Sequence, residues 1–232
     1  MKNKTICFIP ARGGSKGIKN KNLKKINKLT LLDITIKAAL KSKMFSKIIL
    51  SSDNNKILNL GKKYKILNLK RSFKNSKDNS LTDAALIETL KNIKFKYDNI
   101  VIMQVTSPLR KINTIRNFLN YCEKNKVETC CTVTLLEDQI SVYGKFFNPI
   151  LNNKNMRTRQ KRKKFLIENG LLYFINKSFF LKRKKIFPKK NWNFYITDKY
   201  ESIDINNIND LKICKKLYND HWLNLKKKQI DG

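Results

Sequence analysis

The strongest constraint on the fold of this chain is an alternation of short apolar segments with longer segments of helical type. The apolar segments are residues 5–10, 47–51, 99–104 and 129–136. The helical segments between them are residues 31–40, 54–64, 84–93 and 112–125. Short, continuously apolar runs are typical of strands buried on both faces, and strands that alternate with helices form a parallel sheet covered on both sides. The sequence therefore predicts an α/β fold.

The alternation stops in the second half of the chain. Residues 137–164 are dense in charge and have neither helical nor strand period, which is typical of a long surface loop or of an arm that reaches another subunit. An apolar strand returns at 171–175, and an amphipathic helix follows at 208–218. The predicted organisation is a single domain over 1–225, an inserted arm at 138–168 and a disordered tail at 226–232.

The chain carries a large positive charge. Its 51 Lys and Arg residues against 17 Asp and Glu give a net charge of +34, and phosphate neutralisation by such residues drives non-specific nucleic-acid binding. However, Lys is far commoner than Arg, and Asn and Ile are abundant, as expected of an AT-rich genome. The cations are also spread along the whole chain, which favours solvated surface charge over a nucleic-acid interface.

The cysteine and apolar patterns indicate a cytoplasmic protein. The five cysteines form no CxxC pair and have no histidine nearby, since the single His221 lies near the C-terminus. Zinc is therefore not favoured, and free thiols in a reducing compartment are expected. The apolar run before Pro10 is too short for a signal peptide, and no later run is long enough to span a membrane.

A basic, glycine-bearing loop follows the first predicted strand. In open parallel sheets, ligands bind beyond the carboxyl ends of the strands. Residues 10–22 read PARGGSKGIKNKN, in which the glycines allow close backbone approach and the cations suit a polyphosphate. The spacing is neither a P-loop nor GxGxxG. Taken alone, the loop fits a phosphate site and a plain turn nearly equally well.

Polar side chains also follow two other predicted strands. Asp53 comes after the strand at 47–51, where it suits a metal, a ribose hydroxyl or a helix cap. Gln104, Thr106 and Ser107 come at the end of the strand at 99–104. They offer neutral hydrogen-bonding groups for a polyhydroxylated ligand, and Thr106 or Ser107 equally suits a helix cap.

The remaining polar signals are weaker. Thr82 or Asp83 is expected to cap the helix at 84–93. Asn169 with Gly170 indicates a turn before the strand at 171–175. Asp204 ends a short apolar stretch, where it suits a helix cap, or a metal site if it faces the glycine loop.

Five motifs in a fixed order make the chain resemble a known family. They are IPARGGSKGI at 9–18 with Lys21 and Asn22, SSDN at 51–54, QVTSPLR at 104–110, NGLLY at 169–173 and SIDIN at 202–206. Together, across about residues 5–215, they resemble the CMP-N-acetylneuraminic acid synthetase (acylneuraminate cytidylyltransferase) family, with its legionaminate and pseudaminate relatives.

The resemblance implies a fold and a reaction. The fold is Rossmann-like, with a mostly parallel sheet of the nucleotide-diphospho-sugar transferase type and a small dimerisation arm at 138–168. The reaction joins CTP and a nine-carbon sugar acid to give a CMP-sugar and pyrophosphate, with Mg²⁺, in a cytoplasmic homodimer that makes precursors of surface glycans. Catalysis would rest on positioning and on charge neutralisation at the leaving pyrophosphate.

The resemblance also implies roles for individual residues. The nucleotide would contact Arg12, Gly13, Ser15, Lys16, Lys21, Asn22, Arg71 and Thr82. The sugar acid would contact Gln104, Thr106, Ser107, Asn169, Tyr173 and Tyr195. The metal would be held by Asp204 and Asn206, and the catalytic residues would be Arg12, Lys21 and Asp204.

The chain departs from the family pattern in several places. Where members carry the second aspartate of DID, this chain has Asn206, which keeps an oxygen ligand and loses a negative charge; weaker metal retention is expected. Ser72 replaces a proline after Arg71, and Val105 replaces the first proline of QPTSPLR. Ile167 and Glu168 stand where some members have an arginine before the NG pair, which bears on the choice of sugar.

Two alternatives remain open from the sequence. One is the same chemistry on legionaminate, pseudaminate or another keto-acid sugar, although QVTSPLR and the NG pair argue against a KDO-specific enzyme. The other is a degenerate member that binds nucleic acid, supported by Asn206 and the net charge.

Overall fold

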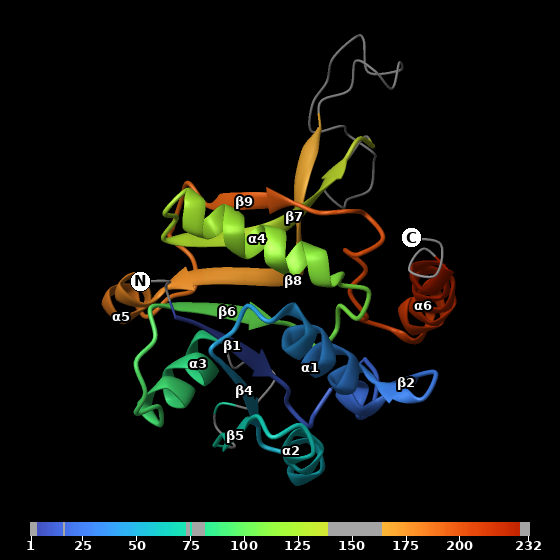
Figure 1. The fold of residues 1–232 in the computed structure, drawn as a ribbon, viewed down its shortest axis with the longest axis horizontal. Helices are drawn as coiled ribbons and strands as arrows, with labels where there is room; N and C mark the ends of the chain where they lie inside the picture. Colours follow the sequence, from blue (N-terminus) through green and yellow to red (C-terminus); the bar gives the residue numbers. More distant parts are fainter. Residues whose placement is uncertain (1–3, 16, 73–74, 76–81, 139–163, 228–232) are drawn as a thin grey trace, which may run out of the picture.

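The computed structural model describes residues 4–15, 17–72, 75, 82–138 and 164–227, with side chains as far as residue 218. Its main sheet has seven strands in the order β5-β4-β1-β6-β8-β7-β9 (Figure 1). These strands are β1 (Thr5–Pro10), β4 (Lys47–Ser52), β5 (Leu67–Lys70), β6 (Asn99–Met103), β7 (Thr129–Leu136), β8 (Phe165–Asn176) and β9 (Asn193–Ile196). A small hairpin joins β2 (Lys25–Ile26) to β3 (Leu29–Thr30).

The mostly parallel sheet predicted from the sequence is confirmed. β1 pairs in parallel with β4 and β6, and β5 and β9 extend the sheet in parallel at its two edges. β8 is antiparallel to both of its neighbours, β6 and β7. The carboxyl ends of β1, β6 and β9 point toward the side of the molecule that holds β2 and α6 (Figure 1).

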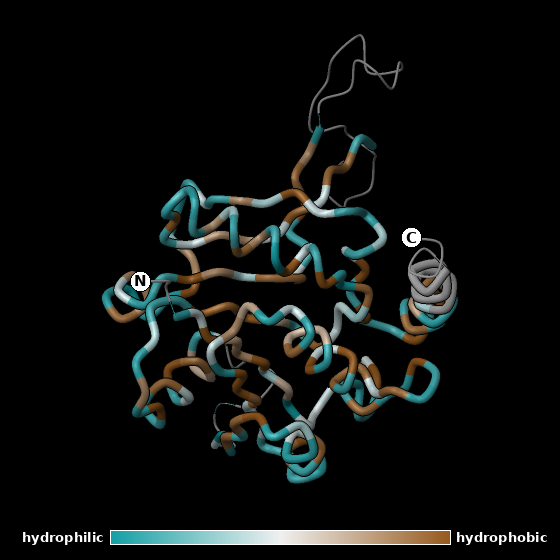
Figure 2. Tube along the Cα trace, in the orientation of Figure 1, coloured by the Kyte–Doolittle hydropathy of each residue, from teal (hydrophilic) through white to brown (hydrophobic). Residues whose placement is uncertain are grey.

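Helices cover both faces of the sheet and divide the core into two. They are η1 (Lys21–Leu23), α1 (Leu31–Ser42), α2 (Asn55–Lys62), α3 (Thr82–Lys91), α4 (Ile112–Lys124), α5 (Lys177–Arg183) and α6 (Ile208–Lys227). One cluster of buried side chains packs α1, α2, α4 and α6 on the sheet, and the other packs α3 and α5 on the opposite face. The apolar residues gather along the central strands, with hydrophilic residues on the outer sides of the helices (Figure 2).

Three of the described helices begin at side-chain caps: α1, α2 and α5, the last of which is capped by Asn176. Thr30 and Asp33 form a reciprocal capping box at the start of α1, in which the Thr30 hydroxyl accepts from the Asp33 amide at 3.0 Å and the Asp33 carboxylate accepts from the Thr30 amide at 2.8 Å. Asn54 caps α2 through its side-chain oxygen. Asp53, which the sequence also suggested as the cap of this helix, is therefore available for another contact.

A large bulge, in which four residues of β8 stand opposite one residue of β7, interrupts the β7–β8 ladder. The register shifts between Cys131 and Val133, so that residues 169–172 of β8 stand opposite Thr132. Gly170 lies within it at φ 68°, a left-handed conformation that a glycine adopts without steric cost. The predicted turn at Asn169 is thus a bulge inside a long strand that already begins at Phe165.

The predicted arm at 138–168 falls mostly outside the described residues, although its last part, 165–168, is the start of β8. The tail predicted at 226–232 is described only at 226–227, which belong to α6. Among the described residues, no helix combines the length and apolar character needed to cross a bilayer.

Candidate active site

The glycine loop leaves β1 and is fixed by residues that follow β4. The Gly13 amide donates to Asp53 Oδ1 at 2.8 Å, so this amide is committed within the protein. A Cβ on Gly13 would lie 2.8 Å from the Asn54 Cβ, which is closer than side chains tolerate. Gly13 therefore serves close packing against the start of α2, whereas the sequence predicted a direct nucleotide contact.

Two further residues of the loop hold it in place. The buried Asn22 amide donates to the Arg12 carbonyl at 2.8 Å and so fixes the backbone that presents Arg12. Lys21 Nζ donates to the Ile205 carbonyl at 2.7 Å, which leaves two of its three protons for a ligand. Ser15 lies half-buried in the same loop, and Lys16 is outside the described residues.

The 204–206 segment faces this loop, as a metal role for Asp204 requires. A Cβ on Gly17 would lie 2.3 Å from the Asn206 carbonyl oxygen, so the two backbones are nearly in contact. The Ile205 amide donates to the Thr106 carbonyl at 2.9 Å. The chain after β9 is therefore attached both to the glycine loop and to the exit of β6.

Three cations gather at this end of the sheet. Partial burial lowers the pKa of Lys21; Asp204 opposes this shift and Arg12 adds to it. Burial likewise lowers the pKa of Arg71, with Asp53 opposing and Arg12 adding to the shift. Cations that depress one another's pKa in this way favour a bound anion.

Arg71 is the most informative member of this group. Arg71 is 8% exposed, and its Nε has no hydrogen-bond partner within the described part of the chain. A buried guanidinium nitrogen without a partner is costly, and a ligand phosphate oxygen would satisfy it. After burial, which is the larger cause, the charge of Arg12 also lowers the pKa of Arg71, so the two guanidinium groups lie close to each other.

The charge of Asp204 acts on both Lys21 and Tyr173. Burial lowers the pKa of Lys21 and raises that of Tyr173, and the charge of Asp204 raises both pKa values to a smaller extent. Asn206 is exposed, and its amide donates to Asp210 Oδ2 at 2.8 Å. Within the described residues, no three acidic, cysteine or histidine side chains gather as a metal cage.

Of the three predicted sugar contacts after β6, Gln104 reaches a cavity, and Thr106 and Ser107 do not. Gln104 lines a cavity of about 330 Å³. Ser107 is fully buried, and its hydroxyl has no hydrogen-bond partner among the described residues. Thr106 contributes its carbonyl to Ile205. Of these three predicted sugar contacts, the structure thus places only Gln104 at the cavity.

Arg110, the last residue of the same motif, is a buried structural link. Its guanidinium donates to the Leu171 carbonyl at 2.8 Å and to the Gln104 carbonyl at 2.8 Å. Burial lowers its pKa to about 10. It ties the end of β6 to the bulge of β8 and so positions the Gln104 backbone.

The cavity lies against α3, β8 and the loop between α5 and β9. Its lining brings together Thr82, predicted for the nucleotide, with Gln104 and Tyr173, predicted for the sugar acid. The other lining residues are Asp83, Lys185, Ile186, Phe187, Pro188 and Trp192. The chain thus forms one cavity where the predicted nucleotide and sugar sites meet.

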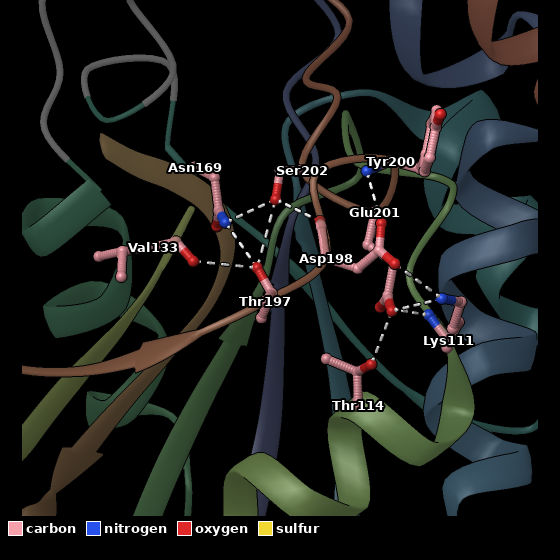
Figure 3. Close-up of polar contacts among 9 residues, drawn as sticks. All are labelled: Lys111, Thr114, Val133, Asn169, Thr197, Asp198, Tyr200, Glu201 and Ser202. Carbon is pink, nitrogen blue, oxygen red and sulfur yellow. Dashed lines mark hydrogen bonds and ion pairs between the residues drawn. The ribbon is translucent and has the colours of Figure 1, made fainter. Parts of the chain in front are cut away.

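Asn169, predicted as a sugar contact, is instead buried and fully engaged. Its side-chain oxygen accepts from the Thr132 hydroxyl at 2.7 Å and from the Leu171 amide at 3.2 Å. Its amide donates to Thr197 Oγ1 at 2.8 Å and Ser202 Oγ at 2.9 Å (Figure 3). No capacity remains for a ligand. The structure therefore gives Asn169 the role of joining the bulge to the chain after β9.

Glu201 holds the other side of this connection. It is 3% exposed and accepts from the Lys111 amide at 3.0 Å and the Thr114 hydroxyl at 2.9 Å. Lys111 Nζ lies 3.2 Å from its Oε1. Figure 3 shows these contacts beside those of Asn169. Residues 197–202 are thus bonded to the start of α4, which fixes where the following 204–206 segment begins.

The two tyrosines predicted for the sugar pocket lie on opposite faces of the sheet. Cys131 pairs with Tyr173, whereas the next residue, Thr132, pairs with Tyr195, and alternate residues of a strand point to opposite faces. The Tyr195 ring packs 5.8 Å from Phe118, on α4. Tyr195 is therefore not brought to the cavity.

Two features of the site were not predicted from the sequence. Asp83, expected as a helix cap, accepts from the Ile186 amide at 2.9 Å and lies 3.5 Å from Lys185 Nζ. The aromatic loop that it holds, with Phe187 and Trp192, was not identified. Two aromatic residues within seven positions, IFPKKNW, were the available signal.

The chain is similar over most of its length to known proteins. The chain is 29% identical over 91% of its length, and 94% of the relative's, to "CMP-N,N'-diacetyllegionaminic acid synthase" of Campylobacter jejuni. It is 26% identical over 98% of its length, and 56% of the relative's, to "N-acylneuraminate cytidylyltransferase" of Streptococcus agalactiae.

Its fold is similar to that of CMP:2-keto-3-deoxy-manno-octonic acid synthetase, solved in complex with CTP. The TM-score is 0.72 at 13% identity, over 94% of this chain and 99% of the other. The family model described as "Cytidylyltransferase" matches residues 6–228. By this match, which spans nearly the whole chain and includes the loop, the cation group and the cavity, the protein belongs to the cytidylyltransferase family and is a nucleotidyltransferase.

Proposed function

We propose that this cytidylyltransferase activates a nonulosonic acid, an N-acylneuraminate or a close relative, for a surface glycan. CTP and the sugar acid give the CMP-sugar and pyrophosphate. The observation that carries the proposal is the group of Arg12, Lys21 and Arg71 at the carboxyl end of the sheet, with the Arg71 Nε buried and without a partner among the described residues. This group lies next to Asp204, whose charge also reaches Tyr173 at the cavity.

In this reaction the anomeric hydroxyl of the sugar loses its proton to solvent, and its oxygen attacks the α-phosphorus of CTP. A new P–O bond forms there, and the bond to the β-phosphate oxygen breaks with pyrophosphate as the leaving group. Arg12, Lys21 and Arg71 neutralise the charge that grows on the departing oxygens. Gln104 and Tyr173 hold the sugar acid on the other side, so that the enzyme acts mainly by positioning two anions that would otherwise repel each other.

A divalent metal fits the residues present. Asp204 supplies a hard carboxylate oxygen next to the cations, and Mg²⁺ commonly uses one or two carboxylates together with substrate phosphates. Mg²⁺ would neutralise charge on the triphosphate of CTP. Asn206 would offer a neutral amide oxygen at most, so the protein contributes little of the negative charge at this position.

Replacing Asn206 with aspartate is expected to lower the Mg²⁺ concentration for half-maximal rate by about three- to tenfold, because a second carboxylate attracts the cation more strongly. The measurement is rate against Mg²⁺ at saturating CTP, together with Mn²⁺ binding to the free enzyme by electron paramagnetic resonance. Asn209→Asp adds the same charge on the first turn of α6 and is the control. An unchanged metal requirement, or an equal effect of the control, would remove residue 206 from the metal site.

The protein is proposed to act as a cytoplasmic homodimer through the segment at 138–168. The strand pair β7–β8 projects from the body of the fold (Figure 1), and Leu166 and Ile167, at the start of β8, are 45% and 42% exposed. Exposed apolar side chains next to a long connection are typical of subunit contacts.

The function is tested by incubating the purified protein with CTP, Mg²⁺ and a panel of nonulosonic acids and measuring pyrophosphate. Release that depends on both CTP and a sugar acid is expected, with KDO a poor substrate. UTP with the same sugars is the nucleotide control. No release with any sugar, together with salt-sensitive RNA binding, would instead support the nucleic-acid alternative.

A further inference from the structure

We propose that Glu88, on α3, is a positioning residue of the nucleotide site. It holds the backbone next to Arg71, so that the Arg71 guanidinium stays where the phosphates of CTP bind. Glu88 acts through Arg71 and does not itself contact the substrate. This inference rests on the proposed function, because it deepens the role given there to Arg71.

Arg71 lies just beyond the end of a short edge strand. β5 has four residues and lies at the edge of the sheet, beside β4. The paired residues end at Lys70 opposite Ser52, and the Arg71 amide adds one bond to the Ser52 carbonyl at 2.9 Å. The end of an edge strand is held from one side and opens easily. The Arg71 backbone therefore needs a second attachment if its side chain is to keep one position.

Glu88 supplies this second attachment. Its Oε1 accepts from the Ser72 amide at 2.7 Å, and its Oε2 accepts from the Ser72 hydroxyl at 3.0 Å. Oε2 also accepts from the side-chain amide of Asn75. Hydrogen bonds to a carboxylate are stronger than those between neutral groups. A proline at residue 72 would offer neither donor, so the attachment depends on the serine of this chain.

The helix that carries Glu88 is firmly attached to the sheet. The next residue, Thr89, is 2% exposed, and its hydroxyl donates to Ser51 Oγ on β4 at 3.2 Å. Ala85 and Leu86, about one turn earlier, are fully buried in the core cluster beneath α3. The carboxylate of Glu88 is thus fixed relative to β4, the same strand that holds the Arg71 amide.

The carboxylate binds the backbone side of Arg71 and leaves the Nε of the guanidinium for a ligand. Partial burial acts to raise the pKa of Glu88, but the hydrogen bonds from Asn75 and Ser72, together with the charge of Arg71, bring it below its ordinary value. Glu88 is therefore ionised at neutral pH. The Arg71 Nε has no hydrogen-bond partner among the described residues. An arginine held in this way loses less conformational freedom when an anion binds.

A counter-charge and a positioning residue predict opposite results. If Glu88 merely offset the charge of Arg71, its removal would strengthen the positive field and lower the KM for CTP. As a positioning residue, Glu88→Ala is expected to raise the KM for CTP about tenfold, with the KM for the sugar acid within about twofold of wild type. Glu88→Gln keeps one oxygen acceptor and is expected to raise the KM for CTP about threefold.

The measurements are pyrophosphate release at varied CTP and varied sugar acid, and CTP binding without sugar by isothermal titration calorimetry. Ser72→Ala removes the hydroxyl and keeps the amide, so it is expected to raise the KM for CTP about threefold. Its effect should be smaller in the Glu88→Ala background, because both residues act through one contact. Glu128→Gln removes an exposed carboxylate just before β7 and is the charge control, with a KM for CTP within about twofold of wild type.

Thermal unfolding checks that each variant is folded. If Glu88→Ala unfolds, Glu88→Gln and Ser72→Ala carry the test. A KM for CTP that falls or stays unchanged in the folded variants, or a KM for the sugar acid that rises equally, would overturn this inference and leave the proposed function intact. No pyrophosphate from the wild type with any sugar would overturn the proposed function itself, and CTP binding to the Glu88 variants by calorimetry would then decide the role of Glu88.

Discussion

Replacing Arg12 with alanine is expected to lower kcat/KM for CTP by about 100-fold or more, with thermal stability close to that of the wild type. Arg12 lies in the group with Lys21 and Arg71. The Asn22 side-chain amide donates to the Arg12 carbonyl at 2.8 Å and so holds the Arg12 backbone in place. The fold is expected to tolerate removal of this side chain because Arg12 lies in the loop that follows β1 and not in a strand. The negative charge on the leaving pyrophosphate would then lack one of its partners.

The measurement is steady-state pyrophosphate release at varied CTP, with the sugar saturating. Lys28→Ala removes the same charge from the exposed turn between β2 and β3 and controls for electrostatic steering. A loss of less than about tenfold for Arg12→Ala, about 1.4 kcal/mol, would mean that Arg12 does not contact the triphosphate in the transition state.

Substituting Gly17 with alanine is expected to lower kcat/KM by about 100-fold, since a displacement of about 1 Å at a reacting site has an effect of that size. The new Cβ would lie 2.3 Å from the Asn206 carbonyl oxygen. That atom belongs to backbone, which cannot rotate aside, so the loop must move from the 204–206 segment. The bond from Lys21 to the Ile205 carbonyl would be strained or lost with it.

Gly14→Ala is the matched control, because a Cβ on Gly14 meets no atom within 4 Å. It is expected to keep kcat/KM within about threefold of wild type. Both variants are compared by pyrophosphate release and by thermal unfolding. If Gly17→Ala performs as well as Gly14→Ala, the contact between the loop and Asn206 is not maintained during catalysis.

Much of the fold follows from local pattern. The predicted strands at 5–10, 47–51 and 129–136 correspond to β1, β4 and β7, and β1 and β7 have the predicted bounds. Buried parallel strands are continuously apolar, which makes them visible in the sequence. The edge strands β5 and β9, with the sequences LNLK and NFYI, were missed because they are short and mix polar with apolar residues.

The site was predictable where it depends on chain order. Parallel strands bring their carboxyl ends to one edge, so the exits of β1, β4 and β6 had to lie together, and the structure places Arg12, Asp53 and Gln104 there. The roles of individual side chains were less predictable. Asn169 and Tyr195 belong to patterns that indicated sugar contacts, but one is bonded within the protein and the other faces α4.

The sequence by itself determined the family, the sheet and the loop that carries the cations, since these depend on residue type and on spacing along the chain. Only the tertiary structure decided which polar groups remain available to a ligand. The bulge in β8 turns Asn169 toward Thr197 and Ser202, and the pairing of β9 with β7 sets the face of Tyr195. A hydrogen-bonding group binds a substrate only if no nearer partner has satisfied it, and those partners lie far away in sequence.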